Sequence, residues 1–473
     1  MTDASSTSVN PAMVQESAIA RFIRATELDT RVLGMVAAII VVWCIFDIWG
    51  YLRLAAGTDS LGGLFGGAFL TPRNLWTLTV QTSSIAIMAT GMVLVIVMRQ
   101  IDLSVGAMLT LVANVAAVLQ VQHLAPALGV GHWSIWIIAV IVALVLGAAV
   151  GAFNGYLIAF LGIPSFIVTL GGLIAYARGI SFYISEGVTI APLDKSFKVL
   201  GGGVPASWLG PFWSWSLAFA ACALIILGIV MGRRQRMRFK FPLRPVWAEI
   251  FLAGLGSAIV LGATLIVNSY AWPPRLIEQY AVANKIPIPP GIEDKDGAAI
   301  CMAADKIVRC AEGYVLYTGY AIPVLLALVV GLVMSFISTR TLFGRYVYAI
   351  GGNPEAAELA GINTKMMTVK VFTLMGVLVA ISAIVSSSRL DAATVSLGDL
   401  NELYVIAAAV IGGTSLAGGL GTIYGAMLGA LMMQSITSGM LLLNLPSPWQ
   451  AIVVGGVLVT AVYLDQIYRR RAK

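Results

Sequence analysis

The stretch MATGMVLVIVMRQIDLSVGAMLTLVANVAAVL, residues 88–119, decides the fold class, because two apolar runs flank a short polar break. A helix that crosses a bilayer needs about 20 apolar residues. Apolar runs recur near 32–51, 78–98, 104–121, 134–161, 166–184, 215–232, 248–267, 316–337, 367–388, 403–443 and 449–466. The 403–443 run is too long for one span, and Gly-Gly pairs at 412–413 and 418–419 divide it. We therefore predict an all-α, polytopic membrane protein with about 10–12 transmembrane segments.

Composition supports this class. The chain has 473 residues, of which 59% are hydrophobic and 11% charged, whereas roughly 25% of an average soluble domain is charged. Lipid can accept that much apolar surface directly. The net charge of +7 does not indicate a nucleic-acid partner, because the basic residues form short clusters between apolar runs. Such clusters are typical of cytoplasmic loops.

Charge also predicts the orientation. The first 30 residues are polar, Arg21, Arg24 and Arg31 precede the first apolar run, and no cleavable signal peptide is visible, so that run should act as an uncleaved anchor. Counting crossings from a cytoplasmic N-terminus places the arginine-rich loop 233–244 inside and the insert 268–315 outside. We expect a cytoplasmic tail at 1–31, a transmembrane domain at 32–466 and a cytoplasmic tail at 467–473.

The 268–315 insert is polar and rich in proline, so we expect an irregular external loop. It could contact an external partner, or it could be a tolerated surface insertion. Cys301 and Cys310 both lie in it and could form a disulfide in an oxidising compartment, or remain two unpaired thiols. With two histidines in the chain, we predict no metal site.

Several motifs are missing. The sequence has no G-x-x-x-x-G-K-[ST] phosphate-binding loop, no H-E-x-x-H and no G-x-S-x-G. No group of acidic residues inside the apolar runs suggests a proton relay. We therefore predict no catalytic residue, and if transport is driven, the energy should come from a separate subunit.

The segment TRTLFGRYVYAIGGNPEAAELAGINTKMMTVKVF, residues 339–372, joins two predicted spans on the cytoplasmic side. Its Asn353-Pro354 pair is typical of a helix start, and Glu355 in the first turn favours the helix dipole. A small apolar face follows, and Gly361 should close the helix. A short amphipathic surface helix of this kind is suited to dock into another protein's groove, although it could also be a plain connector.

A second feature is a weak internal sequence repeat. Residues 88–119 and 403–433 each show an apolar run, a polar break with Ser and Gly, and another apolar run. This pattern is typical of repeats whose helices break at membrane depth, although glycine-rich membrane helices can also resemble one another by chance.

These stretches resemble a known family. Glu355-Ala356-Ala357 followed by Gly361 looks like the EAA signature of ABC-importer permeases, the helix that couples to the ATPase. The surrounding residues 343–362 resemble the ribose/xylose class, as do 101–106, 163–172 and 407–431. Within that class, residues 185–197 and 388–419 look most like D-xylose permeases. The 233–315 region is longer than the family pattern.

The resemblance implies one subunit of a sugar importer in the bacterial cytoplasmic (inner) membrane. It implies three partners: a cytoplasmic ABC ATPase, a second permease subunit that would form a homodimer with this chain, and an external sugar-binding protein. ATP and Mg²⁺ would be bound by the ATPase, so no cofactor is expected in this chain. The coupling region would be residues 340–364, with Glu355, Ala356, Ala357 and Gly361 as its signature.

A neutral sugar needs hydrogen-bonding groups along its path more than charges. Broken helices expose unpaired backbone groups, so the two polar breaks are the candidate path. The first supplies Asp102 and Ser104, although Asp102 could instead cap the next helix. The second supplies Thr414 and Ser415. Weaker candidates, which could simply bond neighbouring helices, are Asn154, Ser165 and Thr169.

Two arginines, Arg99 and Arg178, lie near the ends of predicted helices. Arginine there can snorkel to the interface, and we assign neither residue to transport.

Two other functions compete with that of an importer subunit. A gradient-driven secondary transporter would need paired intramembrane acids, which are missing. A membrane enzyme or channel would need a catalytic cluster or a regular pore-lining pattern, and the sequence has neither.

Overall fold

The structure is a computed structural model that describes residues 18–27, 29–55, 67–273, 276, 300–303, 306–309 and 316–472. Within these residues, ten helices are long and apolar enough to cross a membrane, and two shorter apolar helices lie at 401–411 and 448–463. The prediction of an all-α polytopic membrane protein is therefore confirmed.

The helices are α1 (Ala18–Thr26), α2 (Thr30–Ala55), α3 (Pro72–Val97), α4 (Val105–Val118), α5 (Ala125–Leu128), α6 (Ser134–Ala159), α7 (Ser165–Leu173), α8 (Phe182–Ser185), α9 (Gly210–Arg238), α10 (Val246–Asn268), α12 (Ile322–Arg340), α13 (Leu342–Gly352), α14 (Pro354–Leu359), α15 (Thr364–Leu390), α16 (Asn401–Ile411), α17 (Ile423–Leu442) and α18 (Ser447–Ala472). Short π-helical turns, η1 (Leu119–Leu124) and η2 (Ile174–Ser181), continue α4 and α7, and two 3₁₀ turns are η3 (Phe197–Gly201) and η4 (Pro205–Ser207). The chain divides into two compact units, 1–34 with 218–261, and 35–217 with 262–473.

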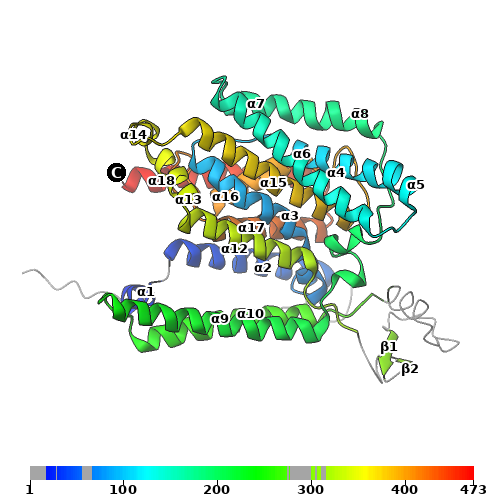
Figure 1. The fold of residues 1–473 in the computed structure, drawn as a ribbon. Helices are drawn as coiled ribbons and strands as arrows, with labels where there is room; N and C mark the ends of the chain where they lie inside the picture. The colour runs from blue at the N-terminus through cyan, green and yellow to red at the C-terminus, as the bar shows by residue number, and fades with distance from the viewer. Residues whose placement is uncertain are drawn as a thin grey trace, which may run out of the picture. The chain divides into compact units, whose positions relative to one another are not determined.

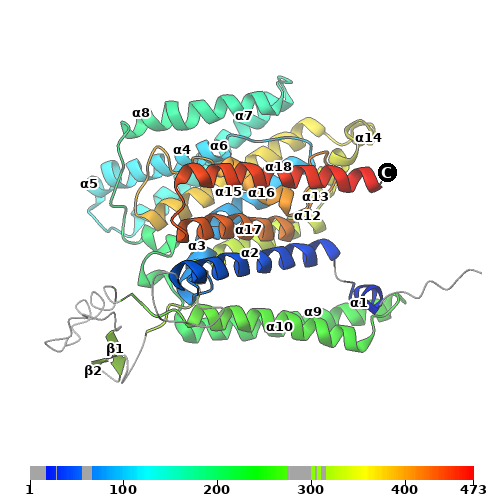
Figure 2. The ribbon, with the colours of Figure 1, turned by 180° about the vertical axis from the view of Figure 1, so that it is seen from behind.

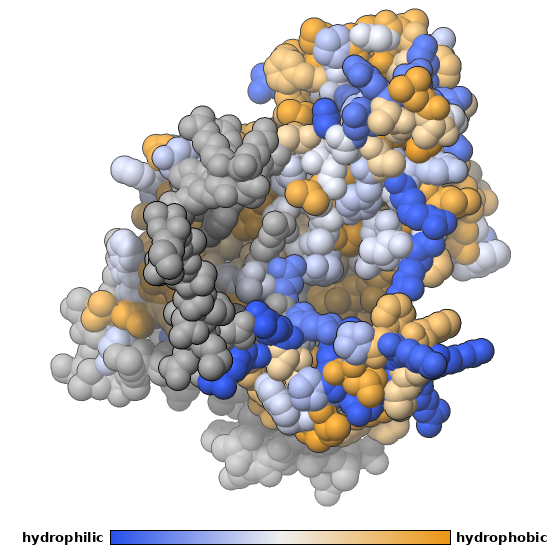
Figure 3. Space-filling model, turned by 90° about the vertical axis from the view of Figure 1, so that its left-hand side faces the viewer, coloured by the Kyte–Doolittle hydropathy of each residue, from blue (hydrophilic) through white to orange (hydrophobic). Residues whose placement is uncertain are grey.

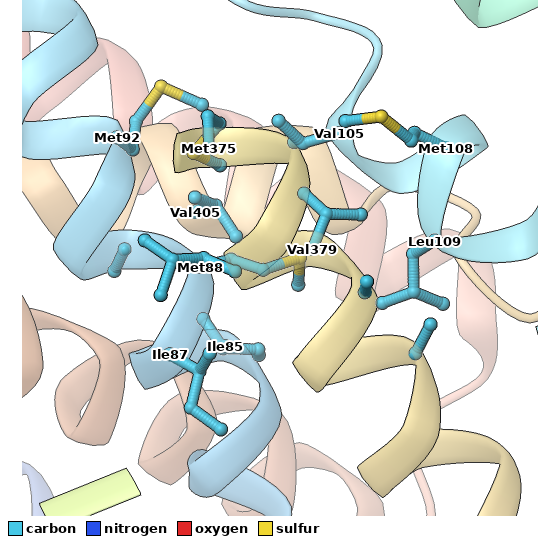
Figure 4. Close-up of a cluster of buried hydrophobic side chains, with 14 of the residues drawn as sticks. Ile85, Ile87, Met88, Met92, Val105, Met108, Leu109, Met375, Val379 and Val405 are labelled. Atoms are coloured by element: carbon cyan, nitrogen blue, oxygen red, sulfur yellow. The ribbon is translucent and has the colours of Figure 1, made fainter. Parts of the chain in front are cut away.

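The larger unit holds the core. Its long helices run side by side in both views (Figures 1 and 2). Apolar side chains from four helices interlock at its centre, among them Met88 of α3, Met108 of α4, Met375 of α15 and Val405 of α16 (Figure 4). All four are fully buried. The predicted spans near 78–98, 104–121, 367–388 and the first half of 403–443 therefore pack against protein rather than lipid.

Glycine allows α6 and α15 to approach closely. A Cβ placed on Gly147 would collide with the carbonyl of Gly376, and one on Gly376 would collide with the carbonyl of Gly147. Gly151 meets the Phe372 carbonyl in the same way. Because lipid tails are as apolar as leucine, membrane helices associate through this kind of backbone contact, which only small residues permit.

The smaller unit contains α1 and most of α9 and α10. The Phe22 ring of α1 lies 5.8 Å from the Trp247 ring and 5.2 Å from the Phe251 ring, both on α10. Glu27, just after α1, accepts hydrogen bonds from Arg236 and Arg244 at 2.6–2.9 Å. These arginines lower the pKa of the Glu27 carboxyl to about 2.

Two expectations need revision. The 268–315 insert is not wholly irregular, because β1 (Ile300–Ala303) and β2 (Lys306–Arg309) pair antiparallel within it. The segment 340–364, predicted to be cytoplasmic, forms two helices, α13 and α14, where the sequence suggested one. Cys301 lies in β1, but Cys310 falls outside the described residues, so their pairing remains a prediction.

Candidate functional site

In the predicted coupling region, residues 340–364, a side chain caps the start of each short helix. The Thr341 side chain accepts a hydrogen bond from the Gly344 amide at the start of α13. Asn353 accepts one from the Ala356 amide at 3.1 Å, which fixes the start of α14. Gly361 has φ of +85°, the left-handed conformation that ends a helix and that glycine adopts without strain. Local sequence chemistry therefore determines where these short helices begin and end.

The signature residues on α14 point two ways. Ala357 is buried against its own chain, whereas Glu355 and Ala356 are exposed. Leu359, predicted to belong to the apolar face, is 90% exposed. Thus α14 presents an exposed apolar side chain, Leu359, and an exposed acid, Glu355. It lies at the left of Figure 1, and the face seen from that side in Figure 3 carries many hydrophilic residues.

The first polar break is a hydrogen-bonded network. A buried carboxylate oxygen of Asp102 accepts from the Ser104 amide at 2.9 Å and from the Ser104 hydroxyl at 2.6 Å. The side-chain amide of Asn154 on α6 donates to the Ser104 hydroxyl at 3.2 Å, and the Tyr176 hydroxyl donates to the Asn154 side-chain oxygen Oδ1 at 2.6 Å. Helix α4 begins at Val105, and the side chain of its N-cap residue Ser104 makes no capping bond. The bond from the Ser104 amide to Asp102 is compatible with both roles considered for Asp102, a capping residue and a path residue. Three predicted path residues therefore meet.

The weaker candidates support this break from outside. Ser165 accepts a hydrogen bond from the Ile101 amide at 3.3 Å. Thr169 donates to the Ser165 carbonyl at 2.9 Å within α7. These contacts agree with the structural alternative stated for both residues, bonding to neighbouring backbone. Arg178 is exposed.

The second break separates α16 from α17 and contains three glycines with positive φ, Gly413, Gly418 and Gly419. Thr414 is fully buried, and its hydroxyl has no hydrogen-bond partner among the described residues. The neighbouring Ser415 hydroxyl donates to the Gly418 carbonyl at 3.3 Å. A buried hydroxyl without a partner costs free energy, so Thr414 remains a candidate for a hydrogen bond to a transported sugar.

The two breaks touch at one place, which also includes the end of α13. The Gly419 amide donates to the Val97 carbonyl at 3.0 Å. Arg99 donates to the Gly351 carbonyl at 2.9 Å and to the Gly352 carbonyl at 2.7 Å. We call this contact of residues 97–99, 351–352 and 418–421 the junction. Arg99 thus bonds backbone of its own chain, a role that the sequence did not suggest.

Sequence reasoning also missed a polar cluster around Asn114 of α4. Its side-chain amide donates to the Thr110 carbonyl at 3.0 Å, the Ser181 hydroxyl at 2.8 Å and the Thr394 carbonyl at 3.1 Å. The Thr110 hydroxyl accepts from the Gly398 amide at 2.9 Å. The signal was available, because Asn114 is a strongly polar residue within an apolar run. The bonds from Asn114 to Thr394, 280 positions away, and from Gly398 to Thr110, 288 positions away, could not be read from the sequence.

Two further observations limit what the candidate site can contain. Among the described residues, no group of three or more His, Cys, Asp or Glu side chains could hold a metal ion. A hollow lined by Phe46, Phe69 and Asn444 lies by the ends of α2 and α17, and no predicted path residue lines it. The candidate site is therefore a set of polar breaks and a surface helix.

Residues 74–462 match the family described as branched-chain amino acid transport system / permease component. The chain belongs to this family of ABC-transporter permeases. It is 36% identical to the xylose transport system permease protein XylH of Escherichia coli K12 over 94% of both chains. It is 32% identical to the XylH protein of Haemophilus influenzae, over 94% of this chain and 98% of that one.

The ribose import permease RbsC of Escherichia coli K12 is 30% identical, over 84% of this chain and 87% of its own. No solved structure matches the chain. The protein is thus the permease of an ABC sugar importer of the xylose, ribose and allose class, a transport subunit rather than an enzyme. This assignment excludes the gradient-driven transporter considered from the sequence.

Proposed function

We propose that this chain forms the membrane pathway of an ATP-driven D-xylose importer in the bacterial inner membrane. The xylose permeases align over more of this chain, and at higher identity, than the ribose permease does. The sugar would pass the polar breaks, with Asp102, Ser104 and Asn154 at the first and Thr414 and Ser415 at the second. Neutral hydroxyls suit these hydrogen-bonding groups.

The observation that carries the transport mechanism is the exposed α14. With both termini cytoplasmic, residues 340–364 face the cytoplasm and the 268–315 insert faces outside. Glu355 and Leu359 are then offered to a cytoplasmic ATPase, which binds ATP and Mg²⁺ and supplies the driving force. A second copy of the chain completes the pathway, and an external sugar-binding protein delivers the substrate.

The sugar is tested by uptake of labelled xylose, ribose and allose in a strain that lacks this gene and its close relatives. Restoring the gene should restore xylose uptake at least about tenfold more than ribose uptake, since a pocket built to hydrogen-bond particular hydroxyls rejects analogues strongly. Equal uptake of all three sugars would contradict the xylose assignment and leave the permease assignment standing.

The coupling role is tested by Glu355→Lys, with Glu358→Lys as its matched control. Both acids are exposed on α14, so folding and membrane insertion should survive either change. We expect Glu355→Lys to abolish sugar uptake and Glu358→Lys to reduce it much less, because only Glu355 occupies the signature position. Normal uptake by Glu355→Lys, with the ATPase still co-purifying, would show that Glu355 does not couple.

A further inference from the structure

Arg99 adopts an unusual conformation at the end of α3. Its φ is +62°, in the left-handed region that non-glycine residues rarely occupy. Its Nε and Nη2 atoms donate to the carbonyls of Gly351 and Gly352, the last two residues of α13. The last four carbonyls of a helix have no partners within it, and a cation there is favoured by the helix dipole. Arg99 therefore caps α13 from another helix.

The backbones at the junction lie too close to admit a methyl group. A Cβ on Gly351 would collide with the Val97 carbonyl and approach the Gly419 amide nitrogen to 2.7 Å. A Cβ on Gly418 would lie 2.5 Å from the Arg99 Cγ atom, and φ at Gly418 is +87°. Adjacent Gly352 differs, because a Cβ there would meet nothing within 4 Å. The close contact is therefore specific to one of two neighbouring glycines.

A second hydrogen bond joins α13 to the other break. Tyr348 of α13 donates its hydroxyl to the Gly421 carbonyl at 2.7 Å, and the Gly419 amide donates to the Val97 carbonyl at 3.0 Å. The end of α13 is thus bonded to the end of α3 and to the loop before α17. Asp102 follows Arg99 by three positions, and Thr414 lies in that same loop.

We infer that Arg99 is a positioning residue that joins the coupling segment to both polar breaks. A displacement of α14 by a partner reaches α13 directly. The junction passes it on to the adjoining residues 101–104 and 412–421, because the backbones of Val97, Gly351 and Gly419 have no free space between them. Close-packed interfaces switch between discrete arrangements rather than deforming gradually. This inference rests on the proposed function, in which an ATPase moves α14.

The test compares Gly351→Ala with Gly352→Ala in the permease assembled with its ATPase. Hydrogen exchange is measured over residues 101–106 and 412–421, with and without ATP. We expect ATP to change exchange in both segments for the wild type and for Gly352→Ala, and to change neither for Gly351→Ala. Sugar uptake per ATP hydrolysed should fall about tenfold in Gly351→Ala, within the usual range of coupling between sites.

Arg99 itself provides the second pair of variants. Arg99→Ala should behave as Gly351→Ala does, and Arg99→Lys should recover part of the ATP response, since lysine can reach one carbonyl but cannot span two with a planar fork. For the two Arg99 variants, which add no volume, melting temperature and ATPase co-purification should stay near wild type. Exchange readouts do not depend on the sugar, so a response to ATP without xylose uptake would support the junction while contradicting the proposed cargo.

Two outcomes would overturn the inference. One is an ATP response at both breaks that persists in Gly351→Ala and Arg99→Ala. The other is a loss of uptake that merely follows a loss of folded, assembled complex, because that result would make the junction a structural contact only.

Discussion

Helices α3 and α9 would look alike on any hydropathy plot, and they have opposite surroundings. The most apolar windows of α3 and α9 have mean hydropathies of 1.9 and 2.3. Yet 89% of the α3 window is buried inside the protein, compared with only 11% of the α9 window. Apolarity therefore identifies both as spans without indicating which one contacts protein. The difference teaches that hydropathy does not distinguish the packed helices of this permease from those that pack little against the rest of the described chain.

Glycines show the same contrast. Gly147 and Gly376 meet backbone to backbone between α6 and α15. Gly228 of α9 and Gly254 of α10 have nothing within 4 Å of a Cβ placed on them. A glycine in a lipid-facing helix is thus replaceable, and one at a helix crossing is required by the close approach of the two backbones.

The largest effect on stability should come from adding a methyl group to a glycine at a helix crossing. Gly376→Ala forces α6 and α15 apart and should destabilise the protein by about 2 kcal/mol, the usual cost of overpacking. Gly228→Ala should leave stability unchanged or slightly higher, because alanine favours helix by about 1 kcal/mol. Thermal unfolding in detergent measures both. Equal melting temperatures for the two variants would mean that the α6–α15 crossing is not tight.

A smaller effect should come from the first break. Ser104→Ala removes the hydroxyl that joins Asp102 to Asn154 without adding volume. Losing such a bond costs about 1 kcal/mol, so uptake should fall roughly fivefold with expression unchanged. The matched control is Ser216→Ala on α9, whose hydroxyl bonds only its own helix, to the Phe212 carbonyl at 2.9 Å.

Sugar uptake by these two serine variants separates path from packing. If Ser104→Ala and Ser216→Ala transport equally well, the buried network serves neither the path nor its shape. A drop confined to Ser104→Ala would support a functional break within the packed part of the protein, beside helices that merely contact lipid.

The sequence predicted what depends on local chemistry. Apolar runs gave the spans, Gly-Gly pairs divided α16 from α17, and Asn353-Pro354 located the start of α14. It could not predict the junction, because Arg99 bonds backbone carbonyls 252 and 253 positions away and carbonyls are identical in every residue. It also missed α13 as a separate helix, since the glycine pair that ends it looked like part of a turn.

The smallest effect concerns the smaller unit. There, ion pairs join the end of α1 to the loop between α9 and α10, whereas close glycine contacts join helices in the core. Glu27 has a pKa of about 2 instead of 4.5, because Arg236 and Arg244 stabilise its charged form. A folded pKa below the unfolded one stabilises the fold above pH 4.5, and this contribution is lost as pH falls toward 2.

Glu27→Gln should therefore lower the melting temperature slightly at pH 7, and the difference from wild type should shrink between pH 4.5 and 2. The effect is small, since these side chains are partly exposed and salt screens them. The Gly376→Ala difference should show no such pH dependence. A Glu27→Gln difference of constant size at every pH would mean that packing, not charge, holds α1 to the arginine-rich loop.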